Sequence, residues 1–372
     1  MRKEVDVLVI GAGQAGLAMG YYLEKEQLSY AIVDAGERIG DTWRNRYESL
    51  VLFTPRGYSS LPGMEFPGDQ DSVPTKNEVA DYMEAYATTF SFPIQLQTVI
   101  NKLERTEEGF RAITNRGEYV SKQVIVATGP FQKPFIPRIA GTLSEEVFQI
   151  HSAAYRAPSD LADGSVLVVG GGNTGVQLAI ELSEDRNVYL ALGEDRKSLP
   201  LQILNKSIFW WFDMLGLLEV SIQSRVGKWL SKQRDPIFGL GPQLKSLVEQ
   251  GKIKLMPKLS GLEGNEVIFN HGEKIAVQNI LWSTGFTRDY SWINIPELFQ
   301  DNGNIDQQRG VTPIPGLYFL GLPWQYRRGS ALIGGVGRDA SYLISKIVDV
   351  KNNNTILDKT SPAKILDRIY KG

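Results

Sequence analysis

The feature that most constrains the fold of this 372-residue sequence is a glycine pattern that occurs twice. The first copy, Gly11-Ala-Gly13-Gln-Ala-Gly16, follows the apolar run Val5–Ile10 and precedes a segment with helical spacing. The second copy, Gly170-Gly-Gly172-Asn-Thr-Gly175, lies in the same context after the apolar run 166–169. A G-x-G-x-x-G turn between a buried strand and a helix is a dinucleotide-binding fingerprint. The two copies predict an α/β protein with two dinucleotide-binding (Rossmann-like) domains.

Each glycine of the pattern has its own steric role. The first permits the tight turn, the second lets the backbone approach a pyrophosphate, and the third lets the helix pack close to the strand. The phosphates then lie on the free N–H groups of a helix N-terminus. We therefore predict that Gly11, Gly13 and Gly16 bind one dinucleotide, and that Gly170, Gly172 and Gly175 bind another.

The two copies differ at the acidic residue that the fingerprint places about 20 residues further on. After the first copy, Asp34 ends the next strand pattern and can reach ribose hydroxyls. Gly193 has the equivalent position after the second copy. Glu194 and Asp195 follow it and oppose a 2′-phosphate, whereas Arg196 favours one. We therefore expect the second site to discriminate poorly between NADH and NADPH.

The positions of these patterns predict the domain organisation. Residues 1–150 plus 285–372 are expected to form the first unit, and residues 155–284 to form a second unit inserted into it. The Pro-rich stretch 129–137 is expected to be a linker, because proline is excluded from central strands and helix interiors. A glycine-rich turn is expected at residues 334–337, before a helix.

The composition excludes several function classes. The chain has no cysteine, so it has no disulfide, thiolate zinc site or redox-active dithiol. Its 40 Lys and Arg against 42 Asp and Glu give a net charge of −2, which argues against nucleic-acid and anionic-membrane partners. Its two histidines lack metal-ligand spacing, so no metal site is expected. No signal-peptide pattern is visible, and we expect a soluble, cytoplasmic protein.

One aromatic-rich run, Ile208–Leu218, stands apart from the strand and helix patterns. It is shorter than the roughly 20 apolar residues that span a bilayer, and Asp213 interrupts it. We expect a buried helix, with a membrane-surface or substrate-channel helix as the alternative.

Two adjacent dinucleotide sites indicate electron transfer from one dinucleotide to the other. The partner that takes a hydride from a nicotinamide is a flavin. We therefore expect FAD at the first site, with its acidic ribose ligand, and NADPH or NADH at the second. Without a dithiol, the electrons can pass only to molecular oxygen with an organic substrate, to a quinone or to an external carrier.

Several motifs resemble the flavin-containing monooxygenases. They are Gly11–Ala18, Gly40-Asp-Thr-Trp-Arg44, Arg46–Pro55, Tyr58–Gly63, Pro74-Thr-Lys76 and Trp282–Phe286, and they cover nearly the whole chain. Within that family the sequence is most similar to short bacterial CzcO-like flavoproteins, which are similar in turn to plant indole-pyruvate monooxygenases. The runs Phe209–Leu218 and Arg328–Gly337 match the same short class.

The resemblance implies further cofactor contacts. Beyond the glycines and Asp34, it implies FAD contacts at Gln14, Ala15, Thr42, Trp43, Val99, Ala127, Thr128 and Gly129. For the nicotinamide nucleotide it implies Asn173 and Thr174, with Gly193, Arg196 and the strand end at Thr284 and Gly285 as further candidates.

Two residues are candidates for the chemistry itself. Other members of the family carry an Asn near the flavin that stabilises its oxygenated state, and Phe53 stands in its place here. His151 belongs to a His-x-x-x-Tyr sequence that ends at Tyr155 and joins the two domains in this family. Ile139 replaces the family's usual Phe two residues before Gly141. We favour a hinge or ribose contact over proton transfer for His151.

Three functions remain open from the sequence. The first is an NAD(P)H-dependent monooxygenase that oxygenates a small sulfide, amine or ketone. The second is a flavin or quinone oxidoreductase that releases hydrogen peroxide without oxygenating a substrate, and the third is an FAD-binding redox sensor without turnover. The expected partners are a small-molecule substrate and molecular oxygen, and the sequence leaves a homodimer open.

Overall fold

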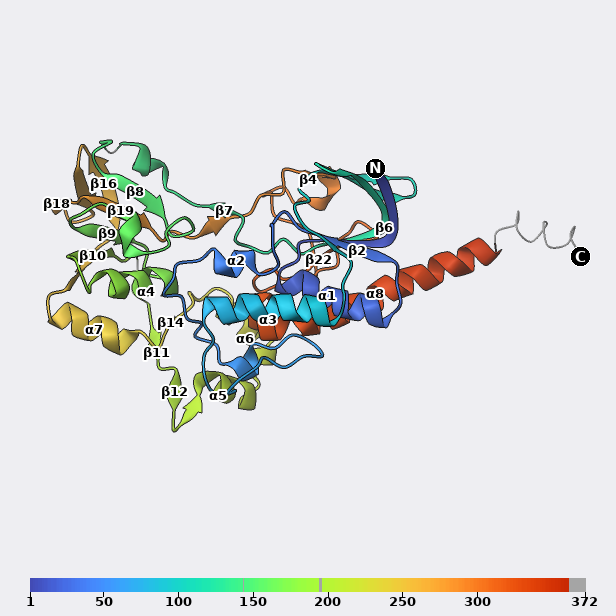
Figure 1. Ribbon diagram of the computed structural model, residues 1–372, viewed down its shortest axis with the longest axis horizontal. Helices are drawn as coiled ribbons and strands as arrows, with labels where there is room; N and C mark the ends of the chain where they lie inside the picture. The colour runs from blue at the N-terminus through green and yellow to red at the C-terminus, as the bar shows by residue number, and fades with distance from the viewer. Residues whose placement is uncertain (143, 194–195, 361–372) are drawn as a thin grey trace, which may run out of the picture.

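The first sheet is built around the N-terminal strand in this computed structural model, which describes residues 1–142, 144–193 and 196–360 (Figure 1). Its strand order is β21-β4-β5-β6-β1-β2-β3, with β22 also paired to β6. The strands are β1 Arg2–Ile10, β2 Tyr30–Val33, β3 Ile94–Gln95, β4 Ile100–Thr106, β5 Gly109–Thr114, β6 Gly117–Val126, β21 Ile293–Asn294 and β22 Leu317–Phe319. Strand β1 pairs in parallel with both β2 and β6, as a dinucleotide-binding sheet requires.

Three helices pack on this sheet around a shared apolar core. They are α1 Gln14–Lys25, α3 Lys76–Thr89 and α8 Ile333–Thr360. Leu17 of α1, Val79 of α3 and Leu343 of α8 are each fully buried in one cluster with Val7 and Val9 of β1. Strand β1 reads as a continuous apolar run over its buried end because both of its faces are covered.

The second sheet is parallel throughout, in the order β15-β10-β9-β19-β8. Its strands are β8 Phe148–His151, β9 Val166–Val169, β10 Val188–Ala191, β15 Ile253–Met256 and β19 Asn279–Trp282. Helices α4 Asn173–Leu182 and α7 Gly241–Glu249 pack on it in one cluster. A small antiparallel sheet packs on the second sheet through another apolar cluster. Its strands are β16 Leu259–Glu263, β17 Glu266–Phe269 and β18 Lys274–Ala276.

The chain passes from the first sheet to the second after β6 and returns before β21. The two passing segments pair with each other as β7 Lys133–Pro134 and β20 Phe286–Thr287, antiparallel. The predicted insertion of one dinucleotide-binding unit into the other is therefore confirmed. Because β8 already belongs to the second sheet, we propose that the second unit starts at about residue 147, before the expected start at residue 155.

A lobe projects from the second unit, away from both sheets (Figure 1). We define it as residues 200–236, between β11 Ser198–Leu199 and β14 Ile237–Phe238, which pair in parallel at its base. It contains β12 Gln202–Ile203, β13 Lys206–Ser207, α5 Ile208–Met214, the turn η4 Leu217–Glu219 and α6 Arg225–Leu230. Short helices elsewhere are α2 Asp41–Arg44, η1 Arg56–Tyr58, η2 Arg138–Thr142, η3 Pro158–Asp160, η5 Pro296–Leu298 and η6 Arg328–Ala331.

Two expectations from the sequence are wrong. The run Ile208–Leu218 is not a buried helix: its first two residues are buried, but Met214 and Leu215 are 55% and 63% exposed. Residues 334–337 form no turn before a helix, since α8 already begins at Ile333. Within the described part of the chain, no helix has both the length and the apolar character needed to cross a bilayer.

Candidate active site

Two glycines of the first turn are tightly packed, and the third faces open space. Gly11 has a φ of +108°, and a Cβ there would lie 2.6 Å from the carbonyl oxygen of Ala127. A Cβ on Gly16 would lie 1.8 Å from the carbonyl oxygen of Gly11. By contrast, a Cβ on Gly13 would have no atom within 4 Å. Gly11 and Gly16 therefore bring strand and helix together, and the backbone of Gly13 faces space that a ligand can enter.

The second turn is constructed in the same way. Gly170 has a φ of +121° and packs against the backbone of Ser283, and a Cβ on Gly175 would collide with Gly170. Gly172 faces open space, and its nearest neighbour is the guanidinium of Arg196, 3.8 Å from the Cβ position. Arg196 also donates to the carbonyl oxygen of Asp235 at 3.3 Å. A cation thus lies beside the one glycine of this turn that is free to approach a phosphate.

Asp34 holds the loop that faces the first turn. One carboxylate oxygen accepts the N–H of Ala12 at 2.6 Å, and the other accepts the N–H of Gly36 at 2.7 Å. A carboxylate has about four lone-pair directions, so two remain for ribose hydroxyls. The side chain is therefore fixed in place at the end of β2 before any ligand binds.

A cavity of about 410 Å³ extends from the first turn to Asn173 and Thr174, the residues of the second turn that begin α4. Many of the predicted site residues line it: Gly11, Gly13, Gln14, Ala15, Asp34, Thr42, Trp43, Phe53, Ala127, Thr128, Gly129, Asn173 and Thr174. The first turn and the start of α4 lie far apart in the sequence, and the insertion of one unit into the other brings them to the same space. Of the sequence predictions, this shared position is the one that the geometry supports most directly.

The start of α8 forms another part of the cavity wall. Ala331, Leu332 and Ile333 line it, and Gln14 donates to the carbonyl oxygen of Ala331 at 3.2 Å. Gly334 has no room for a side chain, because a Cβ would collide with the carbonyl oxygen of Tyr58. The glycines that the sequence suggested as a turn therefore let the positive end of a long helix dipole come close to the cavity.

Phe53 lies on an aromatic wall of the cavity. Its ring stacks on Phe238 with centroids 4.8 Å apart and lies parallel to Phe209 at 6.2 Å. Phe209 lies in the first turn of helix α5, so the aromatic wall connects the cavity with the lobe. The wall can exclude water, but the Phe53 ring offers no hydrogen-bond donor or acceptor.

His151 does not line the cavity, and both of its ring nitrogens have backbone partners. Nδ1 accepts the N–H of Ala153 at 3.0 Å, so Nε2 carries the proton and donates to the carbonyl oxygen of Gly285 at 3.0 Å. Burial lowers the pKa of His151 below its ordinary value of 6.5, and the charge of Arg46 acts in the same direction. A neutral imidazole with no free nitrogen ties β8 to the chain returning from β19, as a hinge residue would.

Other predicted residues lie outside the cavity. Val99 is 43% exposed, and its N–H already donates to the side chain of Asn115. Thr284 donates to the carbonyl oxygen of Phe135, and Gly193 is exposed. Glu194 and Asp195 lie outside the described residues. The roles predicted for these positions stay predictions.

Arg46 is a site residue that the residue-by-residue reasoning missed. It lines the cavity with its guanidinium over the rings of Phe131 and Phe286, at 5.3 and 5.2 Å. It donates a hydrogen bond to the carbonyl oxygen of Thr42, and among the described residues it has no carboxylate partner. Burial lowers its pKa. A half-buried, unpaired cation beside two nucleotide turns is suited to an anionic group of a ligand.

The neighbour of Arg46 connects the two units across the cavity. Tyr47 is buried, and its hydroxyl donates to the side chain of Gln177 on α4 at 2.8 Å. Gln177 in turn donates to the carbonyl oxygen of Ser49. In the sequence, Arg46 and Tyr47 are marked only by their place at the start of the motif Arg46–Pro55, which carries the family resemblance.

Comparison with known proteins identifies the family of the chain. Residues 8–199 match the family described as pyridine nucleotide-disulphide oxidoreductase. A CzcO-like oxidoreductase of Geobacillus kaustophilus is 57% identical over 94% of this chain and 100% of its own. A probable indole-3-pyruvate monooxygenase of Arabidopsis thaliana, YUCCA8, is 25% identical over 92% of this chain and 88% of its own. The solved flavin-containing monooxygenase of Stenotrophomonas maltophilia superposes with a TM-score of 0.79 at 25% identity, over 93% of this chain and 99% of that one.

The disulphide chemistry in the family's description cannot apply to a sequence without cysteine. The two glycine turns, the inserted second unit and the extent of the match to CzcO-like relatives all agree. The chain therefore belongs to the pyridine nucleotide-disulphide oxidoreductase family, as a CzcO-like oxidoreductase.

Proposed function

We propose that this chain is an FAD-dependent monooxygenase that takes its electrons from NADPH or NADH. In the reaction, the nicotinamide nucleotide, a proton, oxygen and a small sulfide, amine or ketone give the oxidised nucleotide, water and the oxygenated substrate. The observation that carries the proposal is the single cavity lined by residues of both dinucleotide turns. Hydride transfer requires the two reacting rings in contact, and a shared cavity permits it.

The residues present fit both groups. The space beside Gly13 and Gly172 is open: a Cβ on Gly13 would have no atom within 4 Å, and the nearest atom to a Cβ on Gly172 would be 3.8 Å away. A side chain at either position would block the approach of a pyrophosphate. Helices α1 and α4 begin at these turns and direct free N–H groups towards that space. Asp34, Thr42 and Trp43 would hold FAD, while Asn173, Thr174 and Arg196 would hold the nicotinamide nucleotide.

The flavin supplies hydride acceptance and reaction with oxygen, and the chain supplies orientation, charge and the exclusion of water. Arg46 offers a fixed positive charge between the two turns. Phe53, with Phe209 and Phe238 packed behind it, keeps one wall of the cavity apolar. Tyr47 and His151 hold the second unit against the first through Gln177 and Gly285.

One observation favours a second candidate, an oxidoreductase that releases hydrogen peroxide. The resemblance to flavin-containing monooxygenases implies that Phe53 takes the place of an asparagine, and a phenylalanine ring has no hydrogen bond to give. A lost hydrogen bond of about 1 kcal/mol shortens the lifetime of an intermediate roughly fivefold. We therefore propose a monooxygenase that is poorly coupled, with part of its oxygen lost as peroxide.

Oxygen balance tests the two candidates. The purified protein is loaded with FAD, and NAD(P)H oxidation, oxygen uptake, peroxide and sulfoxide are measured together with several small sulfides and amines and with a ketone. We expect an oxygenated product in amounts below the oxygen consumed, with peroxide making up the difference. Steady NAD(P)H oxidation without an oxygenated product from any substrate would replace the monooxygenase by the oxidoreductase. A protein that binds FMN instead of FAD would overturn the assignment of the first site.

The preference between the two coenzymes is a separate expectation. Gly193 supplies no side chain to grip or reject a 2′-phosphate, and Arg196 beside Gly172 can attract either pyrophosphate. We expect kcat/KM for NADPH and NADH to agree within about tenfold, a difference of about 1.4 kcal/mol. A preference for NADPH beyond a hundredfold would show that another residue holds the phosphate.

A further inference from the structure

The lobe formed by residues 200–236 carries an unusual share of the exposed apolar surface. Its exposed large apolar residues are Ile203, Leu204, Trp210, Met214, Leu215, Val226 and Trp229. Five of them are more than half exposed, at 82% for Leu204, 55% for Met214, 63% for Leu215, 53% for Val226 and 59% for Trp229. Scattered single apolar residues need no explanation, but a cluster on one projecting element marks an interaction surface.

The internal contacts of the lobe anchor its base and leave its apolar tip exposed. Helix α5 is anchored at its start, where Ile208 and Phe209 are buried against the aromatic wall, and its far end at Met214 is exposed. Ser207 caps the helix by accepting the N–H groups of Phe209 and Trp210. The hairpin β12–β13 is closed by Leu204, whose φ of +51° costs energy in a non-glycine residue.

The charges of the lobe differ in sign from those of the whole chain. Lys206, Arg225, Lys228 and Lys232 are exposed, and none has a carboxylate partner among the described residues. Two of the acids in residues 200–236, Glu219 and Asp235, are already paired with arginines outside the lobe. Asp213 is the acid of that segment without a cation partner among the described residues, so the lobe has four unpaired cations and one unpaired anion. The net charge of −2 for the chain hides this local basic excess.

We propose that this lobe docks on an anionic lipid bilayer. Tryptophan and leucine side chains enter the headgroup region, and lysines beside them attract anionic lipids. Helix α6 has this arrangement, with Val226 and Trp229 three residues apart on one face and Arg225 and Lys228 beside them. Lys206 lies 5.8 Å from the ring of Trp210, which places a cation next to an aromatic anchor.

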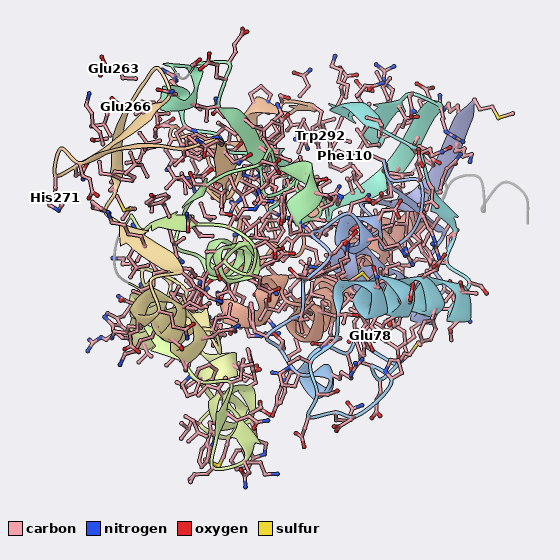
Figure 2. The ribbon with its side chains drawn as sticks, turned by 60° about the vertical axis from the view of Figure 1, so that its left-hand side comes forward. Glu78, Phe110, Glu263, Glu266, His271 and Trp292 are labelled. Atoms are coloured by element: carbon pink, nitrogen blue, oxygen red, sulfur yellow. The ribbon has the colours of Figure 1, made fainter. Side chains whose placement is uncertain are left out.

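A second copy of the chain fits the lobe less well. A symmetric dimer formed through two lobes would place the same four cations opposite each other, which is repulsive. In Figure 1 the hairpin β12–β13 and helix α5 of the lobe project at the lower edge of the molecule, and the yellow-green segment in Figure 2 projects there too, so that this part of the lobe can meet a flat surface before the two sheets do. The membrane-surface alternative for residues 208–218 is thus the one that the exposure and the charges support.

Flotation with vesicles tests the proposal on the full chain loaded with FAD. We expect the protein to float with vesicles of phosphatidylcholine and phosphatidylglycerol in a 7:3 ratio, much less with phosphatidylcholine alone, and less as salt rises. The double variant Leu204→Ser with Leu215→Ser, and the double variant Lys228→Gln with Lys232→Gln, should each bind at least tenfold more weakly. Leu255→Ser and Lys245→Gln, exposed positions outside the lobe, serve as matched controls and should bind as the parent does.

Retained FAD and an unchanged circular-dichroism spectrum show that each variant is folded. Failure of the parent to float with anionic vesicles would overturn the proposal, as would equal binding by the lobe and control variants. Light scattering measures the molar mass of the protein and so tests whether a second copy of the chain binds the lobe instead. A dimer that the Leu204→Ser, Leu215→Ser variant dissociates would assign the lobe to a second copy and also overturn the proposal.

Discussion

Gly13 and Gly16 provide a sharp test of the site, because alanine should have opposite effects at two positions three residues apart. At Gly13 the φ is −76°, which alanine adopts freely, and its methyl group enters empty space. Gly13→Ala should change the free energy of unfolding by less than about 1 kcal/mol, and can even raise it by restricting the unfolded chain. The methyl group nevertheless occupies the face that a pyrophosphate must approach, so FAD binding should weaken by tenfold or more.

At Gly16 the steric situation is reversed. The new Cβ would lie 1.8 Å from the Gly11 carbonyl oxygen, where ordinary contact needs at least 3.4 Å. Relieving this overlap moves strand and helix apart by about 1.5 Å in a close-packed core, at a cost of about 3 kcal/mol or more. Gly16→Ala should therefore destabilise the protein even without cofactor.

Urea unfolding of the apo forms and fluorescence titration with FAD measure both effects. The second turn supplies the matched control, because Gly172 also faces open space at a φ of −79° and Gly175 also packs on a backbone. Gly172→Ala should keep FAD and raise KM for NAD(P)H. If Gly13→Ala retains FAD with full affinity, or if Gly172→Ala loses FAD while Gly13→Ala does not, the assignment of the two turns is refuted.

Three further predictions concern the walls of the cavity. Arg46→Met removes the unpaired cation and with it a charged hydrogen bond of about 1.5–3 kcal/mol to the nucleotide. In steady-state kinetics KM for NAD(P)H should rise tenfold or more, without loss of FAD. An unchanged KM would exclude Arg46 from nucleotide binding. Phe53→Asn should raise the ratio of sulfoxide to peroxide up to about fivefold, provided the new amide is hydrogen-bonded, and a ratio that falls would contradict the role given to Phe53. Because burial depresses the pKa of His151, its neutral form stabilises the fold fully above pH 6.5, and that stability is lost as the pH falls below 6.5 towards the folded-state pKa. Thermal melting from pH 8 to 5 should show this loss in the parent and less of it in His151→Asn, and parallel curves would count against the assignment.

The parts of the fold that the sequence predicted are those set by local sterics. A glycine turn between a buried strand and a helix excludes most other conformations, so both turns and the two-unit architecture could be predicted. Asp34 was found by counting along one strand–turn–helix unit. Its hydrogen bonds to Ala12 and Gly36 link it to the loop facing that turn.

The parts that escaped prediction depend on contacts between distant segments. The guanidinium of Arg46 lies over the rings of Phe131 and Phe286, and these two residues come from the two segments that connect the sheets. Position 334 must be glycine because a Cβ there would collide with the carbonyl oxygen of Tyr58, which is far away in the sequence. The run 208–218 has an apolar pattern that a buried helix and an exposed one share, so only the fold reveals that its far end has no protein to cover it.

The pairing of the two connecting segments has a mechanical consequence. Strands β7 and β20 form a short ribbon, and the carbonyl oxygen of Gly285 accepts hydrogen bonds from both Phe135 and His151 at its end. A ribbon of two bonded strands bends across its flat face but resists torsion, as one unbonded connection would not. We therefore expect the two units to move relative to each other mainly by bending at this ribbon, a motion that would change the width of the cavity that they share.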